Sequence, residues 1–125
     1  MAKPRILDVG QCSYDHGSIS RHLSAAYGAE VARAQSAAEA LKAAKGGGFD
    51  LILINRQLDR DGSPGVDVIR ALKADPDLAD VPVMLVSNFP EAQAEAQALG
   101  ALPGFGKADL RAGHVATLDA ALSPP

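Results

Sequence analysis

The segment Phe49-Asp-Leu-Ile-Leu-Ile-Asn55 contains four consecutive apolar residues followed by an amide. Similar short apolar runs occur at Ile6 to Val9 and at Val83 to Val86, and a weaker run extends from Val31 to Ala34. A strand that is apolar at nearly every position is typical of a sheet covered on both faces. These runs therefore predict the strands of a buried parallel sheet.

Helical patterns lie between the apolar runs. In the first pattern Ile19 and Leu23 recur at helical spacing, and the pattern ends at Gly28, a residue suited to the left-handed turn at a helix end. A capping box at Ser36 and Glu39 predicts the start of a second helix. Three more helices are expected. One has Pro64 in its first turn, the next begins after Asn88 and extends through Leu99, and the last extends from Asp109 to Leu122.

A fifth strand fits at Ala101 to Phe105, and because it contains Pro103 it is expected at an edge of the sheet. Strand and helix then alternate five times, with short connections. This alternation predicts an α/β fold with a doubly wound parallel sheet and helices on both faces. All of residues 1–125 are expected to form a single domain.

The composition excludes several classes of function. A formal net charge of −3 and a low aromatic content provide neither a basic surface nor a stacking platform for nucleic acid. No apolar run is long enough to span a bilayer, and the first residues do not resemble an export signal, so a cytoplasmic protein without membrane contact is expected. The single cysteine, Cys12, agrees with a reducing compartment.

The polar residues that follow the predicted strands are the candidate site residues. In doubly wound sheets, ligands bind outside the carboxyl ends of the strands. The residues at these ends are Gly10, Gln11, Asn55, Ser87, Asn88 and Lys107.

Several segments together resemble the receiver domain of bacterial two-component response regulators. They are Arg5-Ile-Leu7, Phe49 to Asn55, Arg70-Ala-Leu-Lys-Ala-Asp-Pro76, Val81-Pro-Val-Met-Leu-Val-Ser87, Ala98-Leu-Gly-Ala101 and Lys107. The resemblance covers nearly every predicted element. It implies a flavodoxin-like, five-stranded parallel sheet in the order 2-1-3-4-5 with five helices on both faces.

The resemblance also implies a set of functional positions, several of which carry other residue types here. In the family, an aspartate at the end of the third strand accepts a phosphoryl group, and two acidic residues after the first strand hold Mg²⁺. This chain has Asn55 at the acceptor position and Gly10 and Gln11 at the acidic pair. The serine and lysine of the family remain as Ser87 and Lys107. We therefore expect a pseudo-receiver with no catalytic residue, no cofactor and no Mg²⁺ site.

The retained lysine is expected to need polar partners if it is buried. We predict that Asn55, Ser87 and Lys107 form a hydrogen-bonded cluster that holds the domain in one conformation. Asp8 is expected to be a solvated edge or capping residue, because one carboxylate is a poor site for Mg²⁺. The three histidines stand singly, without metal-ligand spacing, and are expected on helix surfaces or ends.

The loop from Arg56 to Gly65 is longer than usual for the family, and its Asp59 and Asp61 make it a candidate partner contact. It is expected to form a tight turn and not a calcium loop. Three functions remain open. The first is a protein-binding signalling domain that acts without phosphorylation, the second is a phosphorelay receiver phosphorylated at one of these two aspartates, and the third is a ligand-sensing domain that uses the vacated pocket. The expected partner is a histidine kinase or another signalling protein. The face from Pro90 to Leu122 is expected to dock a partner or a second copy of the chain.

Overall fold

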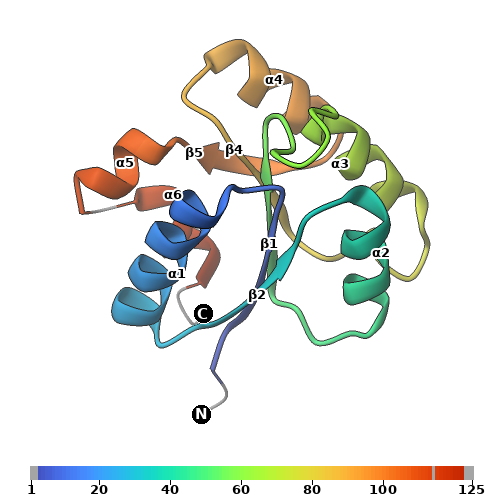
Figure 1. Cartoon of the computed structure of the whole chain (residues 1–125). Helices are drawn as coiled ribbons and strands as arrows, with labels where there is room; N and C mark the ends of the chain where they lie inside the picture. Colours follow the sequence, from blue (N-terminus) through green and yellow to red (C-terminus); the bar gives the residue numbers. More distant parts are fainter. Residues whose placement is uncertain (1–2, 114, 123–125) are drawn as a thin grey trace.

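The computed structural model describes residues 3–113 and 115–122. Five strands form one sheet in the order β2-β1-β3-β4-β5, and every pairing is parallel (Figure 1). The flavodoxin-like order expected for the sheet is therefore confirmed. The strands are β1 (Arg5–Val9), β2 (Glu30–Ala34), β3 (Leu51–Asn55), β4 (Val83–Val86) and β5 (Leu102–Phe105).

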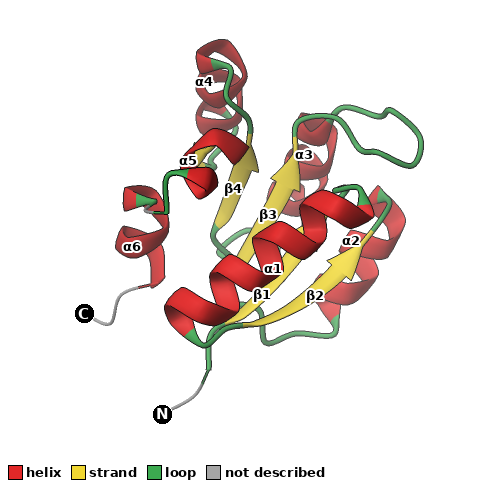
Figure 2. Ribbon diagram, turned by 60° about the vertical axis from the view of Figure 1, so that its left-hand side comes forward, coloured by secondary structure: helices red, strands yellow, loops and turns green. Residues whose placement is uncertain are grey.

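Helices cover both faces of the sheet, as Figure 2 shows. The helices are α1 (Ser13–Tyr27), α2 (Ala37–Lys45), α3 (Gly65–Ala74), α4 (Pro90–Ala98), α5 (Lys107–Arg111) and α6 (Ala116–Leu122). Helices α2, α3 and α4 pack on one face, and α1, α5 and α6 pack on the other. None of the described helices is long and apolar enough to cross a membrane.

Two separate apolar clusters explain why the strands do not alternate between apolar and polar residues. On β1, Leu7 and Val9 face α2 and α3, whereas Ile6 faces α1. On β3, Ile52 and Ile54 belong to the first cluster, and the residues between and before them belong to the second. Because β1, β3 and β4 bury side chains on both faces, apolar residues are needed at consecutive positions.

The predicted helix ends are mostly confirmed, with two differences. Gly28 has a φ of 65° and ends α1, as expected. At α2, Ser36 Oγ accepts a hydrogen bond from Glu39 N at 3.1 Å, but the Glu39 carboxylate accepts from Gln35 N and not from Ser36 N. Pro64 stands before α3 and not in its first turn, because the helix begins at the following residue.

The single helix predicted from Asp109 to Leu122 is wrong. Two short helices, α5 and α6, occupy this region, so the described residues form six helices and not five. Gly113, which follows α5, has a φ of 86°, a left-handed conformation that ends a helix. A glycine within the predicted helix costs about 1 kcal/mol relative to alanine, and its backbone freedom at this position supports a break. The edge position of β5 is confirmed.

Candidate functional site

The carboxyl ends of the five parallel strands meet at one edge of the sheet, and the predicted site residues lie there. Asn55, the last residue of β3, donates a hydrogen bond from Nδ2 to the carbonyl oxygen of Gly10 at 3.2 Å. The same oxygen accepts the backbone N–H of Asp59 at 2.9 Å. The amide of Asn55 thus ties the end of β3 to the end of β1.

The loop between β3 and α3 closes over Gly10. Leu58 of this loop is 1% exposed and packs so tightly on Gly10 that a Cβ atom built on the glycine would collide with the leucine side chain. Gly10 also has a φ of 81°, which strains any residue other than glycine. At the other end of the loop, a Cβ on Gly65 would collide with the carbonyl oxygen of Asn55. The two glycines therefore allow the loop to lie directly on the sheet edge.

The predicted cluster of Asn55, Ser87 and Lys107 is wrong. Lys107 Nζ bonds to Asp15 Oδ2 at 2.7 Å, and Ser87 Oγ accepts the backbone N–H of Phe89 at 3.0 Å. Among the described residues, no hydrogen bond joins the three members to one another. An ammonium group gains more from an ionised carboxylate than from an amide or hydroxyl oxygen. Asp15, which is not among the predicted site residues, supplies that carboxylate.

Asp15 is placed by the first turn of α1. The N-cap of this helix is Cys12, whose sulfur accepts the backbone N–H of Asp15. The hydrogen bond from Lys107 holds the pKa of the Asp15 carboxyl below its usual value. A carboxylate three residues after a helix cap is a common sequence feature, so no local signal marked Asp15 as the partner of a lysine 92 residues away.

Asp8 is fully buried, which contradicts the expectation of a solvated edge residue. It lies in the middle of β1 and its Oδ2 is 2.7 Å from His16 Nδ1 on α1, so His16 is not a simple surface histidine either. Burial raises the pKa of Asp8 to about 6, even though the contact with His16 lowers it. The second carboxylate oxygen of Asp8 is buried without a hydrogen-bond partner.

His16 Nε2 also lies 3.3 Å from Ser20 Oγ, so an aspartate, a histidine and a serine stand in line. Ser20 is in the interior of α1. Backbone N–H groups in a helix interior are bonded within the helix and cannot stabilise an oxyanion. The arrangement is therefore suited to fixing the His16 ring and not to nucleophilic catalysis.

Asp59 and Asp61 are exposed on the β3–α3 loop, as expected for a contact loop. Asp61 Oδ1 accepts the backbone N–H of Ser63 at 2.9 Å and its hydroxyl at 2.7 Å, which lowers the pKa of Asp61. Gly62 between them has a φ of 73°. These contacts form the predicted tight turn.

Solved structures with the same arrangement of elements show which fold this is. A sensor protein from Polaromonas sp. JS666 is 24% identical, with 97% of each chain covered and a TM-score of 0.82. A protein from Chloroflexus aurantiacus that is described as a response regulator is 20% identical, with 98% of this chain and 100% of that chain covered and a TM-score of 0.82. Chemotaxis response regulator CheY4 of Vibrio cholerae is 24% identical, with coverages of 83% and 85% and a TM-score of 0.70.

The chain has the fold of a response regulator receiver domain. Comparisons with models of protein families and with curated proteins gave no match.

The residues at the metal position of this receiver fold do not fit Mg²⁺. Mg²⁺ prefers carboxylate and other hard oxygen ligands in an octahedral arrangement. Gly10 has no side chain, Leu58 fills the space beside it, and Gln11 and Asn55 are neutral amides. Within the described ranges, no three His, Cys, Asp or Glu residues lie together as a metal-binding group. We therefore assign no chemical step to a metal at this edge.

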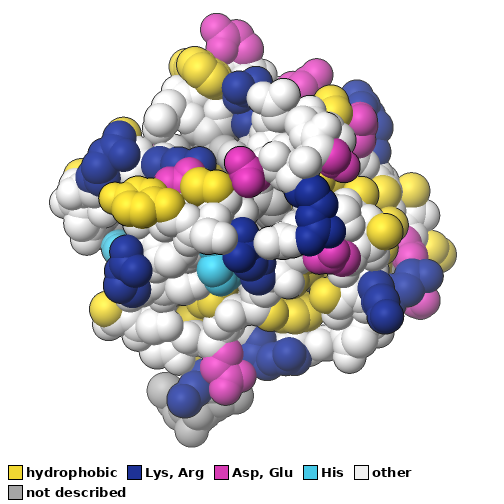
Figure 3. All heavy atoms as spheres, viewed as in Figure 1, with side chains coloured by type: hydrophobic (Ala, Val, Ile, Leu, Met, Phe, Trp, Pro, Cys, Tyr) yellow, Lys and Arg dark blue, Asp and Glu magenta, His cyan; other side chains and the backbone are white. Residues whose placement is uncertain are grey.

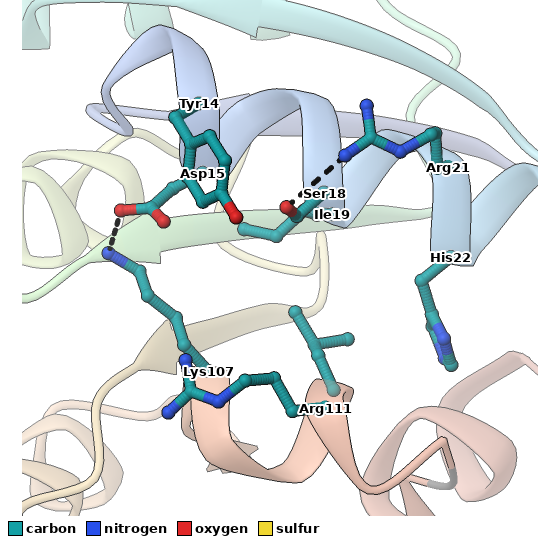
Figure 4. Close-up of a pocket in the computed structure, with 9 residues that line it drawn as sticks. Tyr14, Asp15, Ser18, Ile19, Arg21, His22, Lys107 and Arg111 are labelled. Carbon is teal, nitrogen blue, oxygen red and sulfur yellow. Dashed lines mark hydrogen bonds and ion pairs between the residues drawn. The ribbon is translucent and has the colours of Figure 1, made fainter.

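The lysine position of the receiver fold faces a hollow between α1 and α5, as Figure 4 shows. The hollow has a volume of about 280 Å³, and Lys107 reaches across it to Asp15. Arg111 also points toward this hollow from α5, and Arg21 lines it from α1. Lys107 thus links α5 to Asp15 of α1, and its bonded partner is not Asn55 at the end of β3.

Proposed function

We propose that the chain is a receiver-type signalling domain that acts without phosphorylation, by binding a protein and not by catalysis. The observation that carries the proposal is the closed edge of the sheet. The side chain at the end of β3 is an amide bonded to the Gly10 carbonyl, and Leu58 occupies the space beside Gly10. A carboxylate nucleophile and a metal would both be needed for ordinary phosphoryl transfer to a receiver.

The contacts around this edge favour a single conformation. Lys107 is held by Asp15 and Ser87 is held by the backbone of Phe89. Because both groups already have these partners, neither is available to bind a charged group at Asn55. A domain with these contacts is suited to presenting a constant binding surface.

The proposed partner is a histidine kinase or another signalling protein, in the cytosol. The face from Pro90 to Leu122, which includes α4, β5, α5 and α6, is the proposed docking surface for such a partner or for a second copy of the chain. On this face the side chain of Leu102 is 38% exposed. Phe89, the residue that precedes Pro90, is 53% exposed. On the face seen in Figure 3, acidic and basic side chains are interspersed, which suits a protein partner better than nucleic acid.

Incubation with acetyl phosphate and Mg²⁺, followed by intact-mass spectrometry, tests the proposal. We expect no phosphate adduct on the wild-type chain, while a receiver with an aspartate acceptor, treated in parallel, is modified. A stoichiometric adduct on the wild-type chain would contradict the proposal.

The alternative function is a phosphorelay receiver phosphorylated at Asp59 or Asp61. Both carboxylates are exposed on the β3–α3 loop, so a phosphodonor could reach them. If an adduct forms, the variants Asp59→Asn and Asp61→Asn identify the acceptor. Loss of the adduct in one of them would establish the alternative.

Self-association through the face from Pro90 to Leu122 needs its own test. Light scattering coupled to size-exclusion chromatography is run over a range of protein concentrations. A dimer that is weakened by Leu102→Glu would support this surface, and a strict monomer at the highest concentration would remove the second copy as the partner.

A further inference from the structure

A second hollow lies at the same edge of the sheet, on the side of β2. It has a volume of about 230 Å³ and lies between the ends of β1 and β2 and the β3–α3 loop. Its lining includes Gly10, Gln11, Ser13, Arg33, Asp59 and Arg60. Asn55, Ser87 and Lys107 do not line it, but it includes Gly10 and Gln11, the positions of the acidic pair in the receiver family.

Buried polar groups without partners mark this hollow as a binding site. Gln11 is 2% exposed, and neither atom of its side-chain amide makes a hydrogen bond of normal geometry, although the amide lies close enough to the buried Asp8 carboxyl to lower its pKa. The Nε atom of Arg33 is also buried and unpartnered. A buried donor or acceptor left unsatisfied costs about 1 to 3 kcal/mol, so such groups in native proteins usually serve water or a ligand.

Arg33 is held in place by hydrogen bonds and lies near the buried Asp8, whose pKa its charge lowers. Its two terminal nitrogens donate to the Gln11 carbonyl at 3.0 Å and to Ser13 Oγ at 3.3 Å. The ion pairs found among the described residues do not include Arg33, whereas Arg60 is paired with Glu39. A guanidinium that is already oriented loses little further entropy when it binds an anion.

The local backbone adds to the attraction for negative charge. Ser13 is the first residue of α1, a helix of 15 residues, and the positive end of its dipole adjoins the hollow. Asp59, the acidic residue of the lining, is exposed and can accept a hydrogen bond from a hydroxyl group of a ligand. No aromatic or aliphatic side chain lines the hollow, so it offers no surface for a nucleobase or an apolar group.

We propose that this hollow binds the oxyanion group, carboxylate or phosphate, of a small hydroxylated metabolite through Arg33 and Gln11. The proposal does not depend on the proposed signalling function, because it rests on Arg33 and Gln11 and not on whether Asn55 can be phosphorylated.

Amide NMR titration of the ¹⁵N-labelled chain tests the proposal with two probes, inorganic phosphate and L-malate. We expect saturable shifts of the Gly10, Gln11 and Ser13 signals with at least one probe below about 20 mM, an affinity typical of a small anion. Shifts with phosphate alone indicate a phosphate group, and shifts with malate alone indicate a hydroxycarboxylate.

Three variants separate a built site from general charge attraction. Arg33→Met and Gln11→Leu are expected to weaken binding about tenfold or more. Arg21→Met is the matched control, because Arg21 also bonds to a serine hydroxyl but lines the other hollow, and it should bind as the wild type does. Circular dichroism checks that each variant is folded. If Arg33→Met is unfolded, Arg33→Lys, which lacks the Nε donor, is used with the same expectation.

Two results would overturn the proposal. One is the absence of shifts at these amides with both probes. The other is equal binding by the wild type and the Arg33 and Gln11 variants, or equal weakening by Arg21→Met.

Discussion

At the scale of single residues, Asp8 is the least expected feature of the molecule. A carboxylate in the middle of an apolar strand is costly to bury, and its contact with His16 offsets only part of that cost, since the pKa of Asp8 remains raised to about 6. Arg33 lies beside Asp8 on β2, because the two are register partners. Asp8 is buried between His16 of α1 and Arg33 of β2, which are themselves partly buried.

The raised pKa of Asp8 predicts how stability depends on pH. The folded chain holds the Asp8 proton more tightly than the unfolded chain, whose carboxyl has a pKa near 3.8. Stability from this group therefore increases as the pH falls through about 6 and is lost as the pH rises through the same value. Relative to Asp8→Asn, the wild type should gain about 2 kcal/mol between about pH 7.5 and 4.5.

Urea unfolding of both proteins at several pH values measures this difference. The asparagine variant is a suitable control because its amide oxygen can still accept a hydrogen bond from His16. Parallel stability profiles for the two proteins would show that Asp8 does not titrate in this range.

The partner of Lys107 can be tested with double-mutant cycles. The cycle of Lys107→Met with Asp15→Asn should give a coupling of about 0.5 to 1 kcal/mol, as expected for a partly exposed ion pair. The cycle of Lys107→Met with Asn55→Ala should give a coupling of about zero. Chemical denaturation supplies the free energies of unfolding. A larger coupling in the cycle with Asn55 than in the cycle with Asp15 would support a contact between Asn55 and Lys107 and contradict the ion pair.

At the scale of elements, the β3–α3 loop determines which groups are accessible at the edge of the sheet beside Gly10. The loop is bonded to β1 through Asp59 and Gly10, and it turns at Gly62 before Pro64 leads into α3. An isolated bridge between Gln57 and Pro64 joins the two arms of the loop. Within this loop, Leu58 folds back onto Gly10.

Gly10→Ala should therefore destabilise the chain by about 2 kcal/mol or more, because backbone strain and overpacking against Leu58 add. Gly28→Ala is the matched control. Gly28 also has a positive φ, of 65°, but a Cβ there meets no atom within 4 Å, so a loss of only about 1 kcal/mol is expected. Thermal and urea unfolding compare the two variants. Equal losses would mean that the contact with Leu58 is not tight.

Several elements were predictable because their signals are local. The apolar runs at β3 and β4 and the glycine that ends α1 follow directly from periodicity and backbone preference. The break at Gly113 was missed because a glycine in a helical pattern has the same local appearance whether it weakens a helix or ends it. The positions of Asn55 and Gly10 could be predicted, but the partner of Lys107 could not, since Asp15 of α1 and Lys107 of α5 are far apart in the sequence and meet only in the folded chain.

At the scale of the whole molecule, two contacts on the face of the sheet covered by α1 join segments that are distant in the sequence. Tyr27, the last residue of α1, donates a hydrogen bond from its hydroxyl to Asp119 of α6 at 2.5 Å. Burial and the neighbouring carboxylate raise the pKa of the Tyr27 hydroxyl. This contact and the Lys107–Asp15 pair join the two ends of α1 to the C-terminal part of the chain.

Tyr27→Phe should lower the free energy of unfolding by about 1 kcal/mol, because the hydrogen bond is lost while the ring still packs. Hydrogen exchange is expected to become faster in α6 and to remain unchanged in α2, which lies on the other face. Exchange that increases equally in both helices would show that the contact does not act locally on α6.

Under the proposed function, the contact of Leu58 with Gly10 has a consequence for how a cell could use this domain. A switchable receiver stores information as a covalent mark, and the mark outlasts the stimulus. A domain whose edge is closed by an apolar side chain carries no such memory. Its output would depend on its concentration relative to the dissociation constant of its complex. Synthesis and degradation of the chain would then be the means of control.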